Sequence, residues 1–417
     1  LAARVGCGPA GPDASVHEPG APVDVCSPVA PDEELLRSLA RSSNAFGLDL
    51  WRAAVPVDGN AALSPASVHI TMTQAWVGAH GETATQMEQA LYLDRDRERV
   101  LDAVAAQLAL WNDPCEEHHH LAVVNGLFAD EQFVVKDDYL DLAAEVYGSS
   151  VEPVDFRNAP EEAGAHINEW FAEQTEGRIR AVVEPERLSP DARTVLANAV
   201  AFKGSWDEPF RSILEGPFTR ADGESVPSEM MHLSDRFAYL ETDDMQLIEL
   251  PYEGGELAMA VLLPRSPDGL PQLERDLDLD ALDGWLAAAE QQDVRVAFPR
   301  FELRADRPME LNDALARLGV TEAQRRFHAD FPGISDPMDP AERLFLGQIV
   351  HTAEVEVDEK GTVATAATAL TLPASGCSKP PDPPVFRADH PFLFLSRDAS
   401  SGSILFMGRV ADPTGGR

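Results

Sequence analysis

The spacing of apolar residues changes along the chain, and helical spacing dominates its first part. From Asp32 to about Ala54 the apolar residues recur every three or four positions, which predicts a helix with one buried face. Ser64 followed by Pro65 predicts the start of a second helix, because a serine side chain caps the first turn and proline fits that turn. Residues 81–87 predict a third helix start. Helices are therefore expected mainly in the first part of the chain.

Strand patterns dominate the rest of the chain. Short apolar or alternating segments between turn residues predict strands over 121–128, 194–202, 247–250, 257–263, 294–301, 345–357, 392–396 and 404–410. The segment 194–202 is almost wholly apolar, so we expect it to be central in a sheet. Helices early and strands late are typical of an α+β fold.

Two stretches lack any periodicity. Residues 1–31 are rich in Gly, Pro and Ala and predict a flexible leader or tether, which leaves residues 32–417 as a single domain. Residues 361–384 are almost uncharged and rich in Ala, Thr and Pro, although they lie between two predicted strands. A structureless loop of this length inside a domain is often functional.

The charge balance is strongly acidic. The chain carries 71 Asp and Glu against 33 Lys and Arg, a formal net charge of -38. Such a surface repels nucleic acid and anionic membranes, so neither is expected as a partner. No apolar run reaches the ~18–20 residues of a membrane-spanning helix, so we expect no transmembrane span.

The cysteines point outside the cytoplasm in two alternative ways. Cys7 and Cys26 lie in the leader and could form a disulfide, which is typical of exported proteins. Alternatively, Val5-Gly6-Cys7 is similar to the end of a lipoprotein signal, in which the cysteine is lipidated. Both alternatives predict a secreted or cell-envelope-associated protein.

Common enzyme motifs are missing from the sequence. It contains no G-x-S-x-G, no H-E-x-x-H and no glycine-rich phosphate loop, so we expect neither an enzyme nor a bound cofactor. His118, His119 and His120 are consecutive, and neighbouring side chains of a strand face opposite sides, so they do not converge on one ion. The sequence therefore predicts no metal site.

Several segments, in order along the chain, resemble the serpins, a family of serine protease inhibitors, and in particular a bacterial-type inhibitory serpin. Residues 351–370, HTAEVEVDEKGTVATAATAL, are similar to the last strand and hinge of the serpin reactive loop, and residues 386–395, FRADHPFLFL, to the signature that follows it. Further matches are 63–67, 78–87, 167–179, 198–210, 249–264 and 327–335. The resemblance implies an α+β fold of three β-sheets with about nine helices and an exposed reactive-centre loop over about residues 359–385.

The resemblance implies that this loop is bait for a protease. The protease attacks the loop to form an acyl-enzyme, and the cleaved loop then enters a sheet as a new strand and carries the trapped enzyme with it. The hinge that enters first is expected at Glu359, Gly361, Thr362, Val363, Ala364, Thr365, Ala366, Ala367 and Thr368. None of residues 362–368 is charged or proline, so any of them fits a sheet interior. Inhibitory serpins commonly carry Glu where this chain has Val363, and the alternating faces of a strand should tolerate the exchange.

The scissile bond is expected near the middle of the loop. Counted from Gly361, the usual hinge length of the family puts it between Ser375 and Gly376, with Cys377–Ser378 as the second choice. Small residues on both sides favour an elastase- or subtilisin-like serine protease as the partner, and a cysteine protease is a further alternative.

Two further groups of residues follow from the resemblance. A polar cluster, at the place where the strands of the large sheet part, is expected from Ser64, Ser67, Asn198 and His351. A second group, at the top of that sheet, is expected from Arg300 and Glu359, which pair beside Trp206.

Three functions are compatible with the sequence taken alone. The first is a monomeric serine protease inhibitor, able to polymerise by inserting the loop of one molecule into the sheet of another. The second is a non-inhibitory serpin that acts as a carrier, chaperone or structural protein; such serpins commonly carry bulky, charged or proline residues in the hinge. The third is a tethered surface protein with an Ala/Thr linker, which leaves the ordered series of motifs unexplained. The small, uncharged hinge of this chain favours the inhibitor.

Overall fold

The structure, a computed structural model, describes residues 32–112, 119–175, 177–304, 307–337, 343–362 and 382–415. In this part of the chain the α-helices are α1 (Glu33–Ala54), α2 (Pro65–Trp76), α3 (Gly81–Ala90), α4 (Arg97–Trp111), α5 (Asp137–Tyr147), α6 (Pro160–Gln174), α7 (Leu270–Asp276), α8 (Leu279–Ala288) and α9 (Asn312–Arg317). No helix among them combines the length and the apolarity that crossing a membrane requires. The predicted leader over residues 1–31, with Cys7 and Cys26, lies outside the described residues.

The three helices predicted from the first part of the chain are present. α1 begins after Asp32, whose carboxylate accepts a hydrogen bond from the backbone N–H of Glu34 at 3.0 Å. α2 begins after Ser64, whose hydroxyl accepts one from the N–H of Ser67 at 3.3 Å. α3 begins at Gly81, as the motif predicted. Every residue of α2 is buried, so this helix has no solvent-facing side.

One sheet contains the strand predicted to be central. Its strands lie in the order β10 (Phe301–Leu303), β12 (Gln348–Val357), β4 (Thr194–Ser205), β2 (His119–Asp130) and β3 (Ser150–Val154), with β11 (Met309–Glu310) beside β12 and β13 (Gly361–Thr362) beside β4. β4 is parallel to β12 and antiparallel to β2. The segment 194–202 therefore lies between two other strands, as expected. We call this sheet the insertion sheet.

The other strands form one longer network. Their order is β1 (Ala61–Leu63), β16 (Ile404–Val410), β15 (Phe392–Asp398), β8 (Leu257–Pro264), β7 (Met245–Pro251), β6 (Ser225–Glu241), β9 (Glu290–Pro299) and β14 (Val385–Arg387), with β5 (Ser212–Thr219) beside β6. β6 pairs with β5 and β9 along most of its length and with β7 at its end. Because β6 runs from one expected sheet into the next, the second and third sheets implied by the resemblance share one hydrogen-bonded network.

One predicted strand is in fact two. The sequence predicts a single strand over 294–301, but β9 ends at Pro299 and β10 begins at Phe301 in the insertion sheet. Proline has no N–H to donate to a ladder, which favours a break there. Arg300 makes the crossing between the sheets, and its backbone N–H donates to the carbonyl of Glu229 at 2.9 Å.

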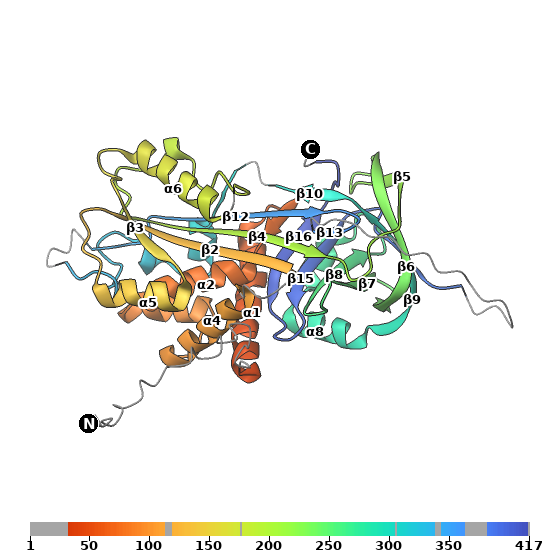
Figure 1. The fold of residues 1–417 in the computed structure, drawn as a ribbon, viewed down its shortest axis with the longest axis horizontal. Helices are drawn as coiled ribbons and strands as arrows, with labels where there is room; N and C mark the ends of the chain where they lie inside the picture. The colour runs from red at the N-terminus through yellow and green to blue at the C-terminus, as the bar shows by residue number, and fades with distance from the viewer. Residues whose placement is uncertain are drawn as a thin grey trace, which may run out of the picture. The chain divides into compact units, whose positions relative to one another are not determined.

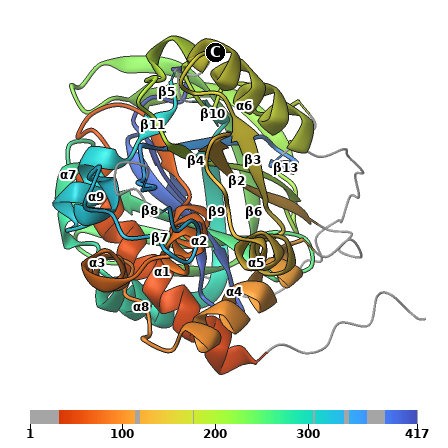
Figure 2. The same ribbon diagram turned by 90° about the vertical axis from the view of Figure 1, so that its left-hand side faces the viewer.

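Helices cover the insertion sheet on both faces. Figure 1 shows α6 above β2, β4 and β12, with α2, α4 and α5 below them, and Figure 2 shows the same layers turned by a quarter. The main core lies on the side of α1 and α2, whereas a second core beneath α6 contains Phe128, Phe171 and Val350. Along β12, Ile349 and Ala353 belong to the main core and Val350 to the second, because successive side chains of a strand face opposite sides.

Candidate functional site

Three neighbouring strands of the insertion sheet place polar side chains in one row. Asn125 on β2 pairs with Asn198 on β4, and Asn198 pairs with His351 on β12. Side chains at paired positions point to the same face of a sheet. All three are buried, so each needs hydrogen-bond partners inside the protein.

The first turn of α2 supplies some of those partners. The backbone N–H of Ser64 donates to Nε2 of His351 at 3.0 Å, and the Ser64 hydroxyl donates to the carbonyl of Leu405 at 2.6 Å. The side-chain amide of Asn198 donates to the hydroxyl of Ser67. The structure thus brings the four residues of the predicted polar cluster together in one network, which joins α2 to β4 and β12.

The hydrogen bonds of His351 define its tautomer. Its Nε2 accepts from a backbone N–H, so this nitrogen carries no proton, and the proton of the neutral ring is on Nδ1. Nδ1 therefore donates to Oδ1 of Asn198 at 2.8 Å, which links β12 to β4 through side chains as well as backbone. Burial lowers the pKa of His351 to about 3, so the ring is neutral at physiological pH.

Asn125 and Thr71 belong to the same network, and sequence reasoning missed both. Oδ1 of Asn125 accepts from the amide of Asn198 at 2.8 Å and from the hydroxyl of Thr71. Nδ2 of Asn125 has no hydrogen-bond partner among the described residues. The signal in the sequence was an amide inside the otherwise apolar segment 121–128, but the register that sets it opposite Asn198 is visible only in the structure.

The second predicted group lies where β12 ends. Nε of Arg300 donates to the carboxylate of Glu359 at 3.0 Å. Burial is the largest single influence on the pKa of Glu359 and acts to raise it. The hydrogen bond from Arg300, a backbone hydrogen bond and the positive charges of Arg300 and Lys360 together outweigh burial, so the pKa is lowered overall. The pair is partly exposed, 30% and 23% for the two side chains, so its contribution to stability is modest, about 1 kcal/mol or less.

Trp206 holds the turn that carries Glu359. Its indole N–H donates to the carbonyl of Asp358 at 3.0 Å, and its backbone N–H donates to the carbonyl of Lys360 at 2.9 Å. The buried indole ring stacks on Tyr252, with the ring centroids 4.6 Å apart. The turn is therefore fixed to the end of β4 by Trp206 and to β9 and β10 by Arg300.

Gly361 ends this turn in a conformation that only glycine adopts readily. Its φ is +142°, and a Cβ at this position would overlap the carbonyl oxygen of Gly204. The close approach lets Gly361 and Thr362 pair with Ser205 and Gly204, antiparallel to β4. β13 is therefore a two-residue strand on the edge of β4.

That edge is open because β4 and β12 part beside it. Their pairing covers Gln348–Glu354 of β12 opposite Val195–Ala201 of β4. Beyond Glu354, β12 pairs with β10 on its other side, and β4 pairs with β13. The strands thus diverge at the point where β13 lies beside β4.

Several predicted residues lie outside the described residues. They are the hinge positions Val363, Ala364, Thr365, Ala366, Ala367 and Thr368 and the two candidate scissile bonds, Ser375–Gly376 and Cys377–Ser378. Among the described residues, no group of three or more His, Cys, Asp or Glu side chains is arranged to hold a metal ion.

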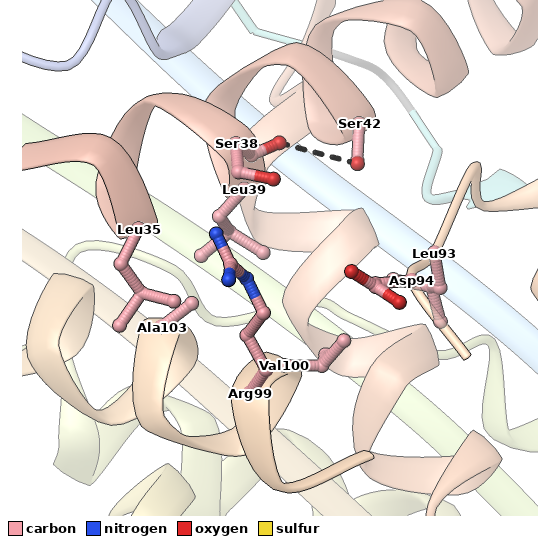
Figure 3. Close-up of a pocket in the computed structure, with 9 residues that line it drawn as sticks. All are labelled: Leu35, Ser38, Leu39, Ser42, Leu93, Asp94, Arg99, Val100 and Ala103. Carbon is pink, nitrogen blue, oxygen red and sulfur yellow. Dashed lines mark hydrogen bonds between the residues drawn. The ribbon is translucent and has the colours of Figure 1, made fainter. Parts of the chain in front are cut away.

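A small hollow between α1 and α4 is a weaker candidate. Figure 3 shows Leu35 and Ser42 of α1 facing Arg99 and Ala103 of α4, with Asp94 at one side. The volume of this hollow is about 20 Å³, which is room for roughly one water molecule. It does not compete with the insertion sheet as a functional site.

Comparison with known proteins agrees with this geometry. The model of the family described as serpin (serine protease inhibitor) matches residues 41–413. A serpin-like protein of Thermococcus kodakarensis is 35% identical over 91% of this chain and 87% of its own length, and a leukocyte elastase inhibitor of Equus caballus is 33% identical over 91% and 100%. The crystal structure of Serpin48 of Tenebrio molitor, 29% identical, covers 91% of this chain and 98% of its own with a TM-score of 0.78. The resemblance found in the sequence is confirmed: the chain belongs to the serpin family.

Proposed function

We propose that this chain inhibits serine-type endopeptidases by loop cleavage, covalent trapping and strand insertion. The observation that carries the proposal is β13, where Gly361 and Thr362 already pair with β4 at the point where β12 diverges from it. A strand that continued from β13 would run antiparallel to β4 and β12 and could bond to both. The chain thus acts as a protease inhibitor and not as an enzyme of its own.

The covalent step uses the chemistry of the target protease. The protease serine oxygen adds to the carbonyl carbon of Ser375, the bond to the nitrogen of Gly376 breaks, and the new amine leaves with the proton that the protease takes from its serine. The ester that remains ties the protease to the cut end of the loop. Strand insertion then moves the ester away from the position in which water would hydrolyse it.

Insertion requires that β4 and β12 separate along their paired length. The backbone pairing of Gln348–Glu354 and the bond from His351 to Asn198 must both break. The polar row then divides between His351 and Asn198. We infer that this network sets how readily the sheet opens.

The class of target protease is inferred from the sequence of the reactive-centre loop and from the name of one relative. Small residues flank the proposed scissile bond at Ser375, and the equine relative is named for the inhibition of leukocyte elastase. We therefore propose elastase- or subtilisin-like enzymes as targets. We further propose that the protein acts outside the cytoplasm, with Cys7 either lipidated or paired with Cys26.

The test is incubation of the intact protein with pancreatic elastase, subtilisin and chymotrypsin, followed by a denaturing gel. At least one enzyme is expected to give a 1:1 adduct that survives denaturation, with the released peptide beginning at Gly376 by mass spectrometry. A peptide that begins at Ser378 would support the second scissile bond. Cleavage of the loop by all three enzymes with no adduct would reject the inhibitor and favour the carrier or chaperone.

A further inference from the structure

A larger hollow lies on the outer face of the insertion sheet, the face that α6 covers. Its volume is about 510 Å³, and it lies between the segment after α6, strand β12 and the residues after β10. The polar side chains of described residues that line it are Arg178, Arg180, Arg304, Thr352 and Glu354. This hollow lies on the opposite face of the sheet from the polar row of Asn125, Asn198 and His351.

Among the described residues, the lining of the hollow carries more basic than acidic side chains. Three of these residues are arginines and one is a glutamate, whereas the whole chain has 71 acidic residues and 33 basic ones. Burial raises the pKa of Glu354. Arg304 acts against this, but the pKa remains raised overall, so Glu354 loses its negative charge more readily than an exposed carboxylate does. The guanidinium group presents a planar set of donors that matches the oxygens of phosphate and carboxylate.

Arg304 and Arg180 have nitrogens that could donate to a ligand. Arg304 bridges Glu302 and Glu354, with N···O distances of 2.9 and 3.3 Å, through two of its nitrogens. Arg180 donates from Nε to the carbonyl of Gly177 at 2.8 Å, and no carboxylate of the described part of the chain pairs with it. As far as the described residues go, the outer nitrogens of Arg180 are therefore available to an anion.

Thr352 supplies an independent sign that a ligand belongs here. It projects from β12 on the same face as Glu354, and only 6% of the residue is exposed. Its hydroxyl oxygen is buried and has no hydrogen-bond partner in the described part of the chain. A buried hydroxyl without a partner is costly, so the hollow that it lines is a place where a partner is expected.

We propose that this hollow binds a small anion with several oxyanion groups, such as a polyphosphate or a tricarboxylate. Arg180 and Arg304 hold its outer oxygens, and the hydroxyl of Thr352 donates to the innermost one. A hollow of about 510 Å³ has room for such an anion, whereas the hollow of about 20 Å³ between α1 and α4 has room for roughly one water molecule.

Titration calorimetry of the intact protein with tripolyphosphate and with citrate tests the site. One saturable site per chain is expected for at least one of the two probes. Arg180→Gln should weaken it at least ~10-fold, because a charge-assisted hydrogen bond contributes about 1.4 kcal/mol or more. The matched control is Arg41→Gln, which removes the same charge from an exposed position on α1 and should leave binding unchanged.

Thr352→Val separates binding from folding. Valine fills the same space without the unpartnered hydroxyl, so the variant without anion should unfold at the same or a higher urea concentration than wild type. It should nevertheless bind the anion several-fold more weakly. Weaker binding in a protein of undiminished stability would not arise from structural damage.

The outcomes decide between a built site and diffuse attraction. Binding of only one probe supports the site and identifies phosphate or carboxylate as its chemistry. No saturable binding of either probe, or equal weakening by Arg41→Gln and Arg180→Gln, would overturn the proposal. Neither measurement involves a protease, so the result is independent of the proposed inhibitory function.

Discussion

At the scale of single residues, two buried histidines make the fold sensitive to acid. Burial lowers the pKa of His351 to about 3 and that of His69 to about 4, from an ordinary value of 6.5. The unfolded chain therefore takes up these protons before the folded chain does. Above about pH 6.5 the two histidines do not lower the free energy of unfolding. As the pH drops from there towards 4, each histidine lowers the free energy of unfolding by ~1.4 kcal/mol per pH unit.

Replacing His351 by glutamine should reduce this dependence. The slope of unfolding free energy between about pH 6 and 4.5 is expected to fall by ~1.4 kcal/mol per pH unit, measured by urea unfolding at a series of pH values. His166→Gln makes the same exchange at an exposed position on α6 and is the matched control. An unaltered slope in the His351 variant would show that this ring does not stay neutral in the fold.

Gly361 gives a second test at this scale. Alanine at this position is strained at φ +142° and overlaps the carbonyl of Gly204, so β13 should leave β4. The number of inhibitor molecules consumed for each protease molecule trapped should then rise several-fold, as measured by titration of the protease. The control is Gly284→Ala in α8. The Cβ added there contacts no other atom, so this variant should leave the ratio unchanged. The same ratio in both variants would contradict the role given to β13.

The residues of the site were predictable to different degrees. Ser64 and His351 came from motifs, and the structure adds the hydrogen bonds that join them. Asn125 was missed because its importance depends on a register between β2 and β4, strands that lie far apart in the sequence. Thr352 was missed because its lack of a partner is a property of its buried surroundings and not of the residue type.

At the scale of elements, local patterns predicted the strands with clean alternation or continuous apolar runs. β4 is an example, because both of its faces are covered. β6 was not predicted, since its buried, half-buried and exposed positions follow no strict alternation. The break at Arg300 was also missed, because the change of sheet depends on distant partners such as Glu229.

Cleavage of the loop should stabilise the protein if the cut end inserts. A strand continued from β13 would bond to β4 and β12 and bury apolar surface, so the melting temperature of the nicked protein should rise sharply. Thr362→Arg is the comparison, because an unpaired charge resists entry into a sheet interior. This variant should be cut by the protease and gain little stability. Equal melting temperatures of intact and nicked wild type would argue against insertion.

At the scale of the whole molecule, the net charge of -38 should govern encounters with proteases. Opposite charges steer association and salt screens them beyond ~10 Å at 0.1 M. The rate of adduct formation with a basic protease should therefore fall as salt is added, whereas the rate with an acidic protease should rise. Rates that respond to salt in the same direction for both enzymes would show that net charge does not control the encounter.

The burial of α2 on every side also has a consequence for biosynthesis. Ser64, which caps this helix, bonds to the carbonyl of Leu405, and the two residues are 341 positions apart. At the usual ~5–20 residues per second, a ribosome needs roughly 20–70 s to make the intervening chain. For that time the apolar surface of α2 lacks the strands that enclose it in the finished fold, so the nascent chain is the stage at which this protein most needs protection from aggregation.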